Sequence, residues 1–254
     1  MAHFQVWAIP QTVEEAWQLC QSKTAVPVAG NMWVRVCGLR KKTAVDLSSL
    51  NLTGMEDDGE KIICGAMTSL RELETDPALP ENYRKAFQKA FSPIIGVQFR
   101  NTATLGGSLC GRFGFSDVGT LFLALDAELE FYHGGTLPLS GYQAGKPTRD
   151  ILMKVHFRKD CRIAYEAARR SGTDFPLLTA CAVRQGERTR LVLGARPGRA
   201  AIAGEESVWN SQTLEKALQS LTFDGNRRAS KEYRMRIAPV LSERVLKEIG
   251  CWEE

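Results

Sequence analysis

The chain has 254 residues, of which 44% are hydrophobic and 24% charged, and its formal net charge is +4. These values are typical of a globular protein with one large or two small domains, and they exclude a chain that is disordered throughout. The small basic excess does not indicate a nucleic-acid-binding protein, which usually carries a concentrated basic face. No apolar run approaches the roughly 20 residues of a membrane-spanning helix, and no signal peptide is evident, so we expect a cytoplasmic protein.

The cysteines and histidines predict no metal site. No Cys-x-x-Cys pair is present, which argues against a local zinc or iron–sulfur motif, and the three histidines are far apart. Because the cysteine count is odd and a reducing compartment disfavours disulfides, we expect buried free thiols. These thiols belong to Cys20, Cys37, Cys64, Cys110, Cys161, Cys181 and Cys251.

Apolar periodicity predicts short helices and strands along the first part of the chain. Thr12, followed three residues later by Glu15, is typical of a capping box at the start of a helix. In chain order we expect a helix at 12–20, strands at 25–29, 43–47 and 59–66, helices at 68–74 and 79–91, a loop at 98–107, a helix at 117–125 and a strand at 127–132.

A second part begins near residue 150 and continues this mixed order. We expect strands at 152–157, 164–168, 177–183 and 189–194, followed by helices at 213–221 and 233–249. Pro239 lies inside the last of these helices and predicts a kink or a break. The order of elements predicts an α+β fold, because it lacks the regular alternation of a doubly wound sheet.

Two glycine-containing loops carry the chemical signal, one at 26–34 and one at 102–109. Glycine lets a backbone approach a ligand closely, and consecutive main-chain N–H groups in such turns bind anions. Two facing loops of this kind would hold a diphosphate, with Thr104 and Ser108 adding hydroxyl donors. Each loop alone is more often an ordinary turn, and neither matches the dinucleotide pattern Gly-x-Gly-x-x-Gly or a phosphate-binding Walker A loop.

The segment 100–108, followed by Ser116-Asp117 and 123–127, resembles the FAD-binding subunit of the molybdenum hydroxylases, the family of xanthine dehydrogenase and carbon monoxide dehydrogenase. The stretches 165–170 and 230–234 resemble the start of that family's C-terminal domain and its final helix. The resemblance implies a two-lobed FAD-binding domain of the vanillyl-alcohol oxidase type at 1–160, with a small lobe at about 1–52 and a larger one at about 53–160. A C-terminal α+β domain at 161–254 follows.

The resemblance also implies that both loops hold the diphosphate of FAD. The matching residues are Val28, Ala29, Gly30, Asn31, Met32, Trp33 and Val34 in the first loop and Thr104, Leu105, Gly106, Gly107 and Ser108 in the second. Asp117 matches an acidic residue that binds the sugar-alcohol chain of the flavin, since a carboxylate accepts hydrogen bonds from hydroxyls, although Asp117 could instead cap the helix after it. Leu152 matches an apolar residue near the flavin ring system.

Three positions depart from the family's pattern. Met32 lacks the hydroxyl usual at its place, Trp33 replaces an acid, and Ser108 replaces Asn or Asp. Losing one neutral hydrogen bond costs about 1 kcal/mol, so we expect FAD to bind, but more weakly than is usual for the family. Trp33, Phe113 and Phe115 are candidates for a surface that docks a partner, although core packing is the commoner role of such aromatic residues.

The resemblance implies that FAD carries the redox chemistry and that this chain supplies no catalytic side chain and no metal ligand. Iron–sulfur clusters and the molybdopterin cofactor would lie on a small and a large partner subunit, and electrons would leave through FAD to NAD or another acceptor. Two alternatives stay open: a flavin-free structural subunit, suggested by Met32 and Trp33, and a stand-alone flavin reductase or oxidase.

Overall fold

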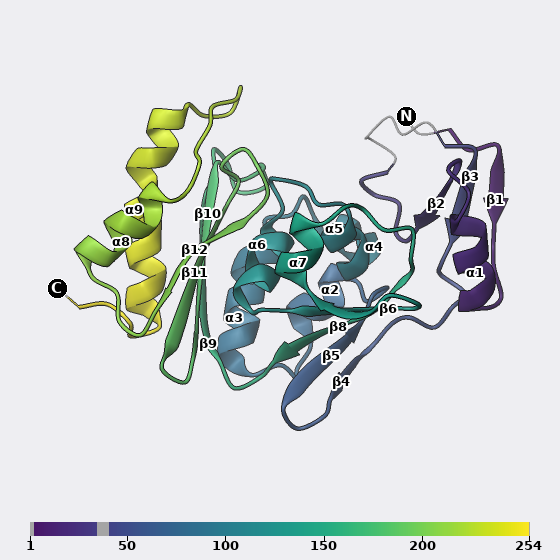
Figure 1. The fold of residues 1–254 in the computed structure, drawn as a ribbon, viewed down its shortest axis with the longest axis horizontal. Coiled ribbons are helices and arrows are strands. Elements are labelled where there is room, and N and C mark those ends of the chain that lie inside the picture. The colour runs from purple at the N-terminus through teal and green to yellow at the C-terminus, as the bar shows by residue number, and fades with distance from the viewer. Residues whose placement is uncertain (1–2, 35–40, 254) are drawn as a thin grey trace.

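The computed structural model describes residues 3–34 and 41–253. Three sheets, each with its own helices, follow one another along the long axis of the molecule (Figure 1). The first described strand lies at one end of this axis, and the last two helices lie at the other (Figure 1). In the described residues, no helix combines the length and the apolar character needed to cross a membrane.

The first sheet has three parallel strands in the order β1-β3-β2, with one helix beside them. Its elements are β1 (Val6–Ala8), α1 (Val13–Cys20), β2 (Ala25–Val28) and β3 (Thr43–Asp46). The predicted cap of α1 is confirmed, since the main-chain N–H of Glu15 donates to Thr12 Oγ1 at 3.1 Å. The Glu15 carboxylate instead accepts the N–H of Gln11, so the second arm of the box lies one residue earlier than predicted.

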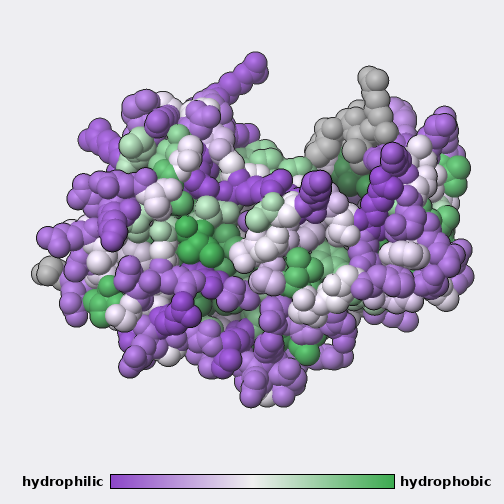
Figure 2. Space-filling model, viewed as in Figure 1, coloured by the Kyte–Doolittle hydropathy of each residue, from purple (hydrophilic) through white to green (hydrophobic). Residues whose placement is uncertain are grey.

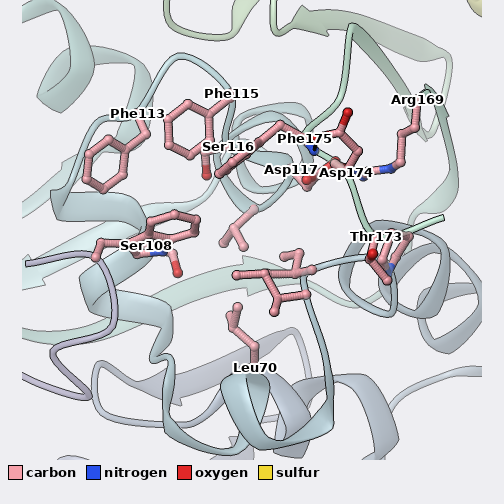
Figure 3. A pocket seen from close by; sticks show the side chains of 15 residues that line it. Leu70, Ser108, Phe113, Phe115, Ser116, Asp117, Arg169, Thr173, Asp174 and Phe175 are labelled. Atoms are coloured by element: carbon pink, nitrogen blue, oxygen red, sulfur yellow. Dashed lines mark hydrogen bonds and ion pairs between the residues drawn. The ribbon is translucent and has the colours of Figure 1, made fainter. Parts of the chain in front are cut away.

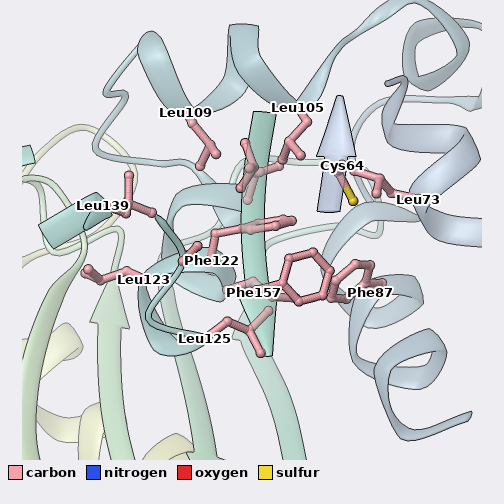
Figure 4. Packing of buried hydrophobic residues seen from close by; sticks show 14 of the residues in the cluster. Cys64, Leu73, Phe87, Leu105, Leu109, Phe122, Leu123, Leu125, Leu139 and Phe157 are labelled. Atoms are coloured by element: carbon pink, nitrogen blue, oxygen red, sulfur yellow. The ribbon is translucent and has the colours of Figure 1, made fainter. Parts of the chain in front are cut away.

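The second sheet has five antiparallel strands in the order β4-β5-β8-β6-β7. Its strands are β4 (Met55–Asp57), β5 (Lys61–Gly65), β6 (Glu128–Phe131), β7 (Gly135–Pro138) and β8 (Leu152–Arg158). The helices beside it are α2 (Leu70–Thr75), α3 (Glu81–Phe91), α4 (Val97–Thr102), α5 (Leu105–Cys110), α6 (Asp117–Ala124) and α7 (Leu139–Ala144). Phe87, Phe122 and Phe157 meet in the middle of its buried core (Figure 4).

The loop predicted at 98–107 is wrong, because α4 and the start of α5 occupy it. The pair Gly106-Gly107 resembles a loop because glycine weakens helices. In the fold, a Cβ on Gly106 would lie 2.8 Å from the main-chain oxygen of Ala66. Glycine therefore allows α5 to pack closely on the chain that follows β5. The residues next to Gly106 in the sequence do not predict this contact.

The third sheet has four antiparallel strands in the order β12-β11-β10-β9, flanked by two helices. Its elements are β9 (Arg162–Ala168), β10 (Leu178–Gln185), β11 (Arg188–Gly194), β12 (Ala201–Glu206), α8 (Ser211–Gln219) and α9 (Lys231–Glu248). Tyr165 and Cys181 face the core of the second sheet, whereas Ala164 and Ala180 face α9. The sheet is thus covered on both faces.

The helix α9 continues through Pro239, which is exposed, so the predicted break at this proline is absent.

The cysteines are unpaired in the described part of the chain. Five are buried as predicted, whereas Cys110 is exposed and Cys37 lies outside the described residues; the buried ones are Cys20, Cys64, Cys161, Cys181 and Cys251. The face seen in Figure 2 is mostly hydrophilic, with small hydrophobic areas separated by polar side chains. Single exposed apolar residues of this kind are normal on a globular protein.

Candidate functional site

The first loop leaves the carboxyl end of β2 and lies directly against the second. A Cβ on Gly30 would lie 1.6 Å from the main-chain oxygen of Thr102, so only glycine permits this approach of the two backbones. Asn31 follows with φ of 56°, a left-handed conformation that asparagine tolerates better than most residues. The two loops predicted to face one another therefore converge.

The second loop is anchored by its own polar groups. The N–H of Leu105 donates to Thr68 O at 2.9 Å, and the N–H of Gly106 donates to Ala66 O at 2.8 Å. Thr104 Oγ1 accepts the N–H of Gly107, and Ser108 Oγ donates to the main-chain oxygen of Thr104. These groups are engaged inside the protein, so they hold the loop in place.

The first loop keeps its donors. Within the described residues, no oxygen accepts the main-chain N–H of Gly30, Asn31 or Met32. The side-chain oxygen of Asn31 is buried and also has no partner there. A buried polar group without a partner costs free energy unless a ligand or water completes its hydrogen bonds. The first loop is therefore the part of the site that can still bind a polar ligand.

A cavity of about 540 Å³ lies between the two loops, and we call it the loop cavity. This volume is in the range of about 300–1,000 Å³ found for small-molecule sites. The sequence-predicted residues that line it are Ala29, Gly30, Asn31, Met32, Trp33, Val34, Thr104, Gly106, Gly107, Ser108 and Leu152. Val28 and Leu105 do not line it, because their side chains are buried in the protein core.

Several residues that line the loop cavity were missed by sequence reasoning. They come from the segment after β5, from the end of β6, from α7 and from the chain before β8, and they include Ala66, Met67, Phe131, Tyr142, Pro147, Thr148, Asp150 and Ile151. These segments carry no recognisable binding motif, and they are tens of residues from either loop in the chain. Only sheet pairing brings them to the cavity.

Asp117 lies in a second, smaller cavity of about 50 Å³, which we call the Asp117 cavity (Figure 3). Ser116, not Asp117, caps α6, because Ser116 Oγ accepts the N–H of Gly119 at 2.9 Å. The Asp117 carboxylate instead accepts hydrogen bonds from the Tyr165 hydroxyl and the Arg169 guanidinium. The alternative role of Asp117 as a helix cap is therefore wrong.

The polar end of the Asp117 cavity is nearly inaccessible to solvent. The side chains of Asp117 and Arg169 are 5% and 9% exposed. Burial raises the pKa of Asp117, and the neighbouring cation and the Tyr165 hydroxyl oppose that shift. Burial and the adjacent carboxylate raise the pKa of Tyr165 well above its usual value, so Tyr165 stays protonated and donates to Asp117.

Five rings, which we call the aromatic cluster, pack together beside both cavities: Trp33, Phe99, Phe113, Phe115 and Phe175. Phe113 and Phe115 stack with centroids 5.2 Å apart, and Figure 3 shows them across the Asp117 cavity from Arg169. Trp33, Phe113 and Phe115 are all half-buried in this cluster. Their rings therefore pack against one another and do not form an exposed face for docking a partner. Met32 packs against the main core.

The site fits a cofactor that contains a diphosphate. The loop cavity is large enough for a substantial part of a dinucleotide, the first loop offers unpartnered N–H donors, and no bulky side chain separates the two loops at the point where they converge. Hydroxyl groups of such a cofactor would complete the hydrogen bonding of the Asn31 side chain. In the described residues, no cluster of side chains suited to a metal ion is present.

Known proteins resemble this chain over most of its length. YgfM of Escherichia coli K-12 is 29% identical over 243 residues, which cover 91% of each chain. The xanthine dehydrogenase FAD-binding subunit of Escherichia coli O157:H7 is 27% identical over 232 residues, covering 80% of this chain and 78% of the relative.

Solved structures share the fold. A carbon monoxide dehydrogenase chain from Hydrogenophaga pseudoflava superposes with a TM-score of 0.85 at 19% identity over 98% of both chains. A quinoline 2-oxidoreductase chain from Pseudomonas putida 86 gives a TM-score of 0.82 at 21% identity over 97% of this chain and 96% of that one. The predicted α+β fold is thereby confirmed.

The family model that describes the FAD binding domain in molybdopterin dehydrogenase matches residues 2–157. These residues contain both loops, the loop cavity and Asp117. Since the match spans more than half of the chain, this protein belongs to the family of FAD-binding domains of molybdopterin dehydrogenases, and its cofactor is FAD.

Proposed function

We propose that this chain is the FAD-binding subunit of a molybdenum hydroxylase complex and that it acts as an oxidoreductase. The observation that carries the proposal is the convergence of the two loops on one cavity in a chain of this family. The relatives support it, since one is a xanthine dehydrogenase FAD-binding subunit and one structural neighbour is a carbon monoxide dehydrogenase.

In this proposal the first loop holds the diphosphate of FAD through the N–H groups of Gly30, Asn31 and Met32. The second loop supplies the other wall and keeps its position through its bonds to the 66–68 segment. Asp117 binds the sugar-alcohol chain, and Leu152 packs near the flavin ring. When bound, FAD accepts electrons and passes them on, and the protein orients it and excludes water.

The partners in this proposal are a large molybdopterin-binding subunit and a small iron–sulfur subunit, and the complex works in the cytoplasm. Electrons travel from the iron–sulfur clusters through FAD to NAD or another acceptor. We also propose that 1–160 is one FAD-binding domain with lobes at about 1–52 and 53–160, and that 161–254 is a C-terminal domain. The two glycine loops then belong to different lobes of one domain.

Purification of the chain with its native partners tests the proposed function. We expect one FAD for each copy of this chain after acid release, together with molybdenum and iron in the same complex. A complete complex without flavin absorbance would support the flavin-free structural subunit instead. Turnover of a substrate by the chain alone would favour a stand-alone flavin reductase or oxidase.

Rapid mixing identifies the electron acceptor. The complex is reduced by its substrate under anaerobic conditions and then mixed with NAD, a quinone or oxygen in turn. We expect the flavin absorbance to return fastest with the physiological acceptor. Reoxidation by oxygen or a quinone alone, with none by NAD, would remove NAD from the proposal.

A further inference from the structure

Three residues line both cavities: Trp33, Ser108 and Phe113. They therefore stand between the first loop, which offers the N–H donors, and Asp117, which offers the buried carboxylate. Ser108 is small, so the two rings form most of this partition. Any ligand that reaches from the first loop to Asp117 must pass them.

The Asp117 cavity is too small for the sugar-alcohol chain of a flavin dinucleotide. Its volume of about 50 Å³ holds only a few water molecules, which need at least about 10–15 Å³ each. The loop cavity, at about 540 Å³, accommodates a ligand of the size of adenosine diphosphate. With the aromatic cluster in its present arrangement, the two halves of the site are therefore unequal.

Trp33 is held in the cluster by fewer polar contacts than Phe175. Phe175, in contrast, is anchored, because its N–H donates to Asp174 Oδ1 at 2.8 Å and the Arg228 guanidinium lies 4.6 Å from its ring centroid. Within the described residues the Trp33 indole N–H has no acceptor. Its contacts are ring packing at 5.3–5.8 Å between centroids, and its loop has unpartnered amides.

We propose that Trp33 is a specificity-determining residue of this site. In its packed position it leaves the loop cavity open to adenosine diphosphate and blocks the way to Asp117, to which the proposed function assigns the sugar-alcohol chain of FAD. A flavin dinucleotide binds only when the indole leaves the aromatic cluster, so it must break the ring contacts that adenosine diphosphate leaves intact. The inference rests on the proposed function and specifies which residue sets the ligand's size.

The test compares the full-length chain with Trp33→Ala and Trp33→Leu, using FAD and adenosine diphosphate as probes. Trp17→Leu is the matched control, because it also removes an indole from the part of the chain that forms the first sheet. The Trp17 ring packs against His133 and lines neither cavity. Calorimetry gives the dissociation constants, and stopped-flow quenching of flavin fluorescence gives the FAD association rate. The leucine variant keeps apolar volume at the position, so it covers the case in which the alanine variant fails to fold.

We expect both Trp33 variants to bind FAD faster and at least about tenfold more tightly, the factor that corresponds to about 1.4 kcal/mol. Their affinity for adenosine diphosphate should change less than twofold, and the control should match the unmodified chain for both ligands. Equal changes for the two ligands, or weaker FAD binding in the Trp33 variants, would overturn the inference.

The outcomes also separate this inference from the proposed function. If the unmodified chain binds FAD and the Trp33 variants bind it equally well, only the role of Trp33 is refuted. If neither the unmodified chain nor any variant binds FAD or adenosine diphosphate, the proposed function fails and the inference fails with it. Binding of FAD by the Trp33 variants but not by the unmodified chain would support the role of Trp33 and contradict the proposed function of the unmodified chain.

Discussion

The space around the backbone and the backbone conformation limit which residue types fit at single positions of the site. Gly30 has no room for a side chain, because the carbonyl of Thr102 occupies the place of its Cβ. Asn31 adopts a left-handed conformation that turns the chain into the loop cavity. Both residues serve the approach of one loop to the other, and this approach makes the site.

A methyl group at Gly30 should therefore damage the site. We expect Gly30→Ala to force the loops apart, to weaken FAD binding at least tenfold and to destabilise the fold by about 1–3 kcal/mol, as overpacking does. Gly172→Ala is the control, since nothing lies within 4 Å of its added carbon. Calorimetric titration with FAD and urea unfolding measure the two effects, and equal behaviour of the two variants would contradict the role of Gly30.

At the scale of elements, buried polar contacts hold the helices that carry the second loop. Arg100 on α4 donates to the Glu74 carboxylate on α2 at 2.9 Å, and to the main-chain oxygens of Ser92 and Ile94. Both side chains are about 5% exposed. A buried ion pair of this kind adds little net stability, but removing one partner leaves the other charge buried without compensation, which is costly.

Removing one partner of this pair should be costly. We expect Arg100→Met to lower the free energy of unfolding by about 3–5 kcal/mol, because Glu74 would remain buried without its cation. Arg71→Met is the control, since Arg71 binds the same carboxylate from the surface and should contribute less than about 1 kcal/mol. Urea unfolding compares them, and a loss below 1 kcal/mol for Arg100→Met would show that the helix does not depend on the pair.

A second link between elements depends on pH. Asp174 binds Arg228 and the N–H of Phe175, and these contacts hold the pKa of Asp174 below its usual value. A lowered pKa in the folded state adds stability above the unfolded pKa of about 3.9, and that stability is lost as the pH falls through the folded value.

We therefore expect Asp174→Asn to lower the urea midpoint at pH 7, and the difference from the unmodified chain to shrink below about pH 4. The amide keeps an oxygen for Phe175 and loses only the charge. Combining it with Arg228→Leu in a double-mutant cycle isolates the pair, and the coupling should vanish at low pH. A midpoint difference that is the same at pH 7 and pH 3 would contradict this account.

At the scale of the molecule, the third sheet joins two cores. Tyr165, Cys181 and Val192 pack into the core around the second sheet, while the opposite face of the same sheet covers α9. Tyr165 and Arg169 also hold Asp117, which belongs to the FAD-binding part of the chain. The C-terminal part therefore completes both the core and the polar end of the site.

The fragment 1–160 should not reach the native state alone. Without β9–β11 it exposes an apolar face, and Asp117 loses both of its partners. We expect strong binding of a hydrophobic dye and poorly dispersed amide resonances. Co-expression with 161–254 is the control and should restore the native spectrum. A well-dispersed spectrum of 1–160 alone would show that its core is sufficient.

Local sequence patterns were enough to predict most of the helices and strands and the kind of ligand. Caps such as Thr12 and the apolar runs of β10 and β11 act between near neighbours, so the helix and the strands they predict are confirmed. The glycine loops indicated a diphosphate for the same reason, because the conformations available to glycine are a local property.

How these elements and loops meet follows from the folded structure. The contacts of Gly30 with Thr102, of Gly106 with Ala66 and of Asp117 with Tyr165 all join residues 40 or more positions apart. Such contacts depend on sheet pairing and on the packing of whole elements, which no local pattern encodes. The division of the site by Trp33 and Phe113 is of the same kind, since each ring takes its place from neighbours distant in the chain.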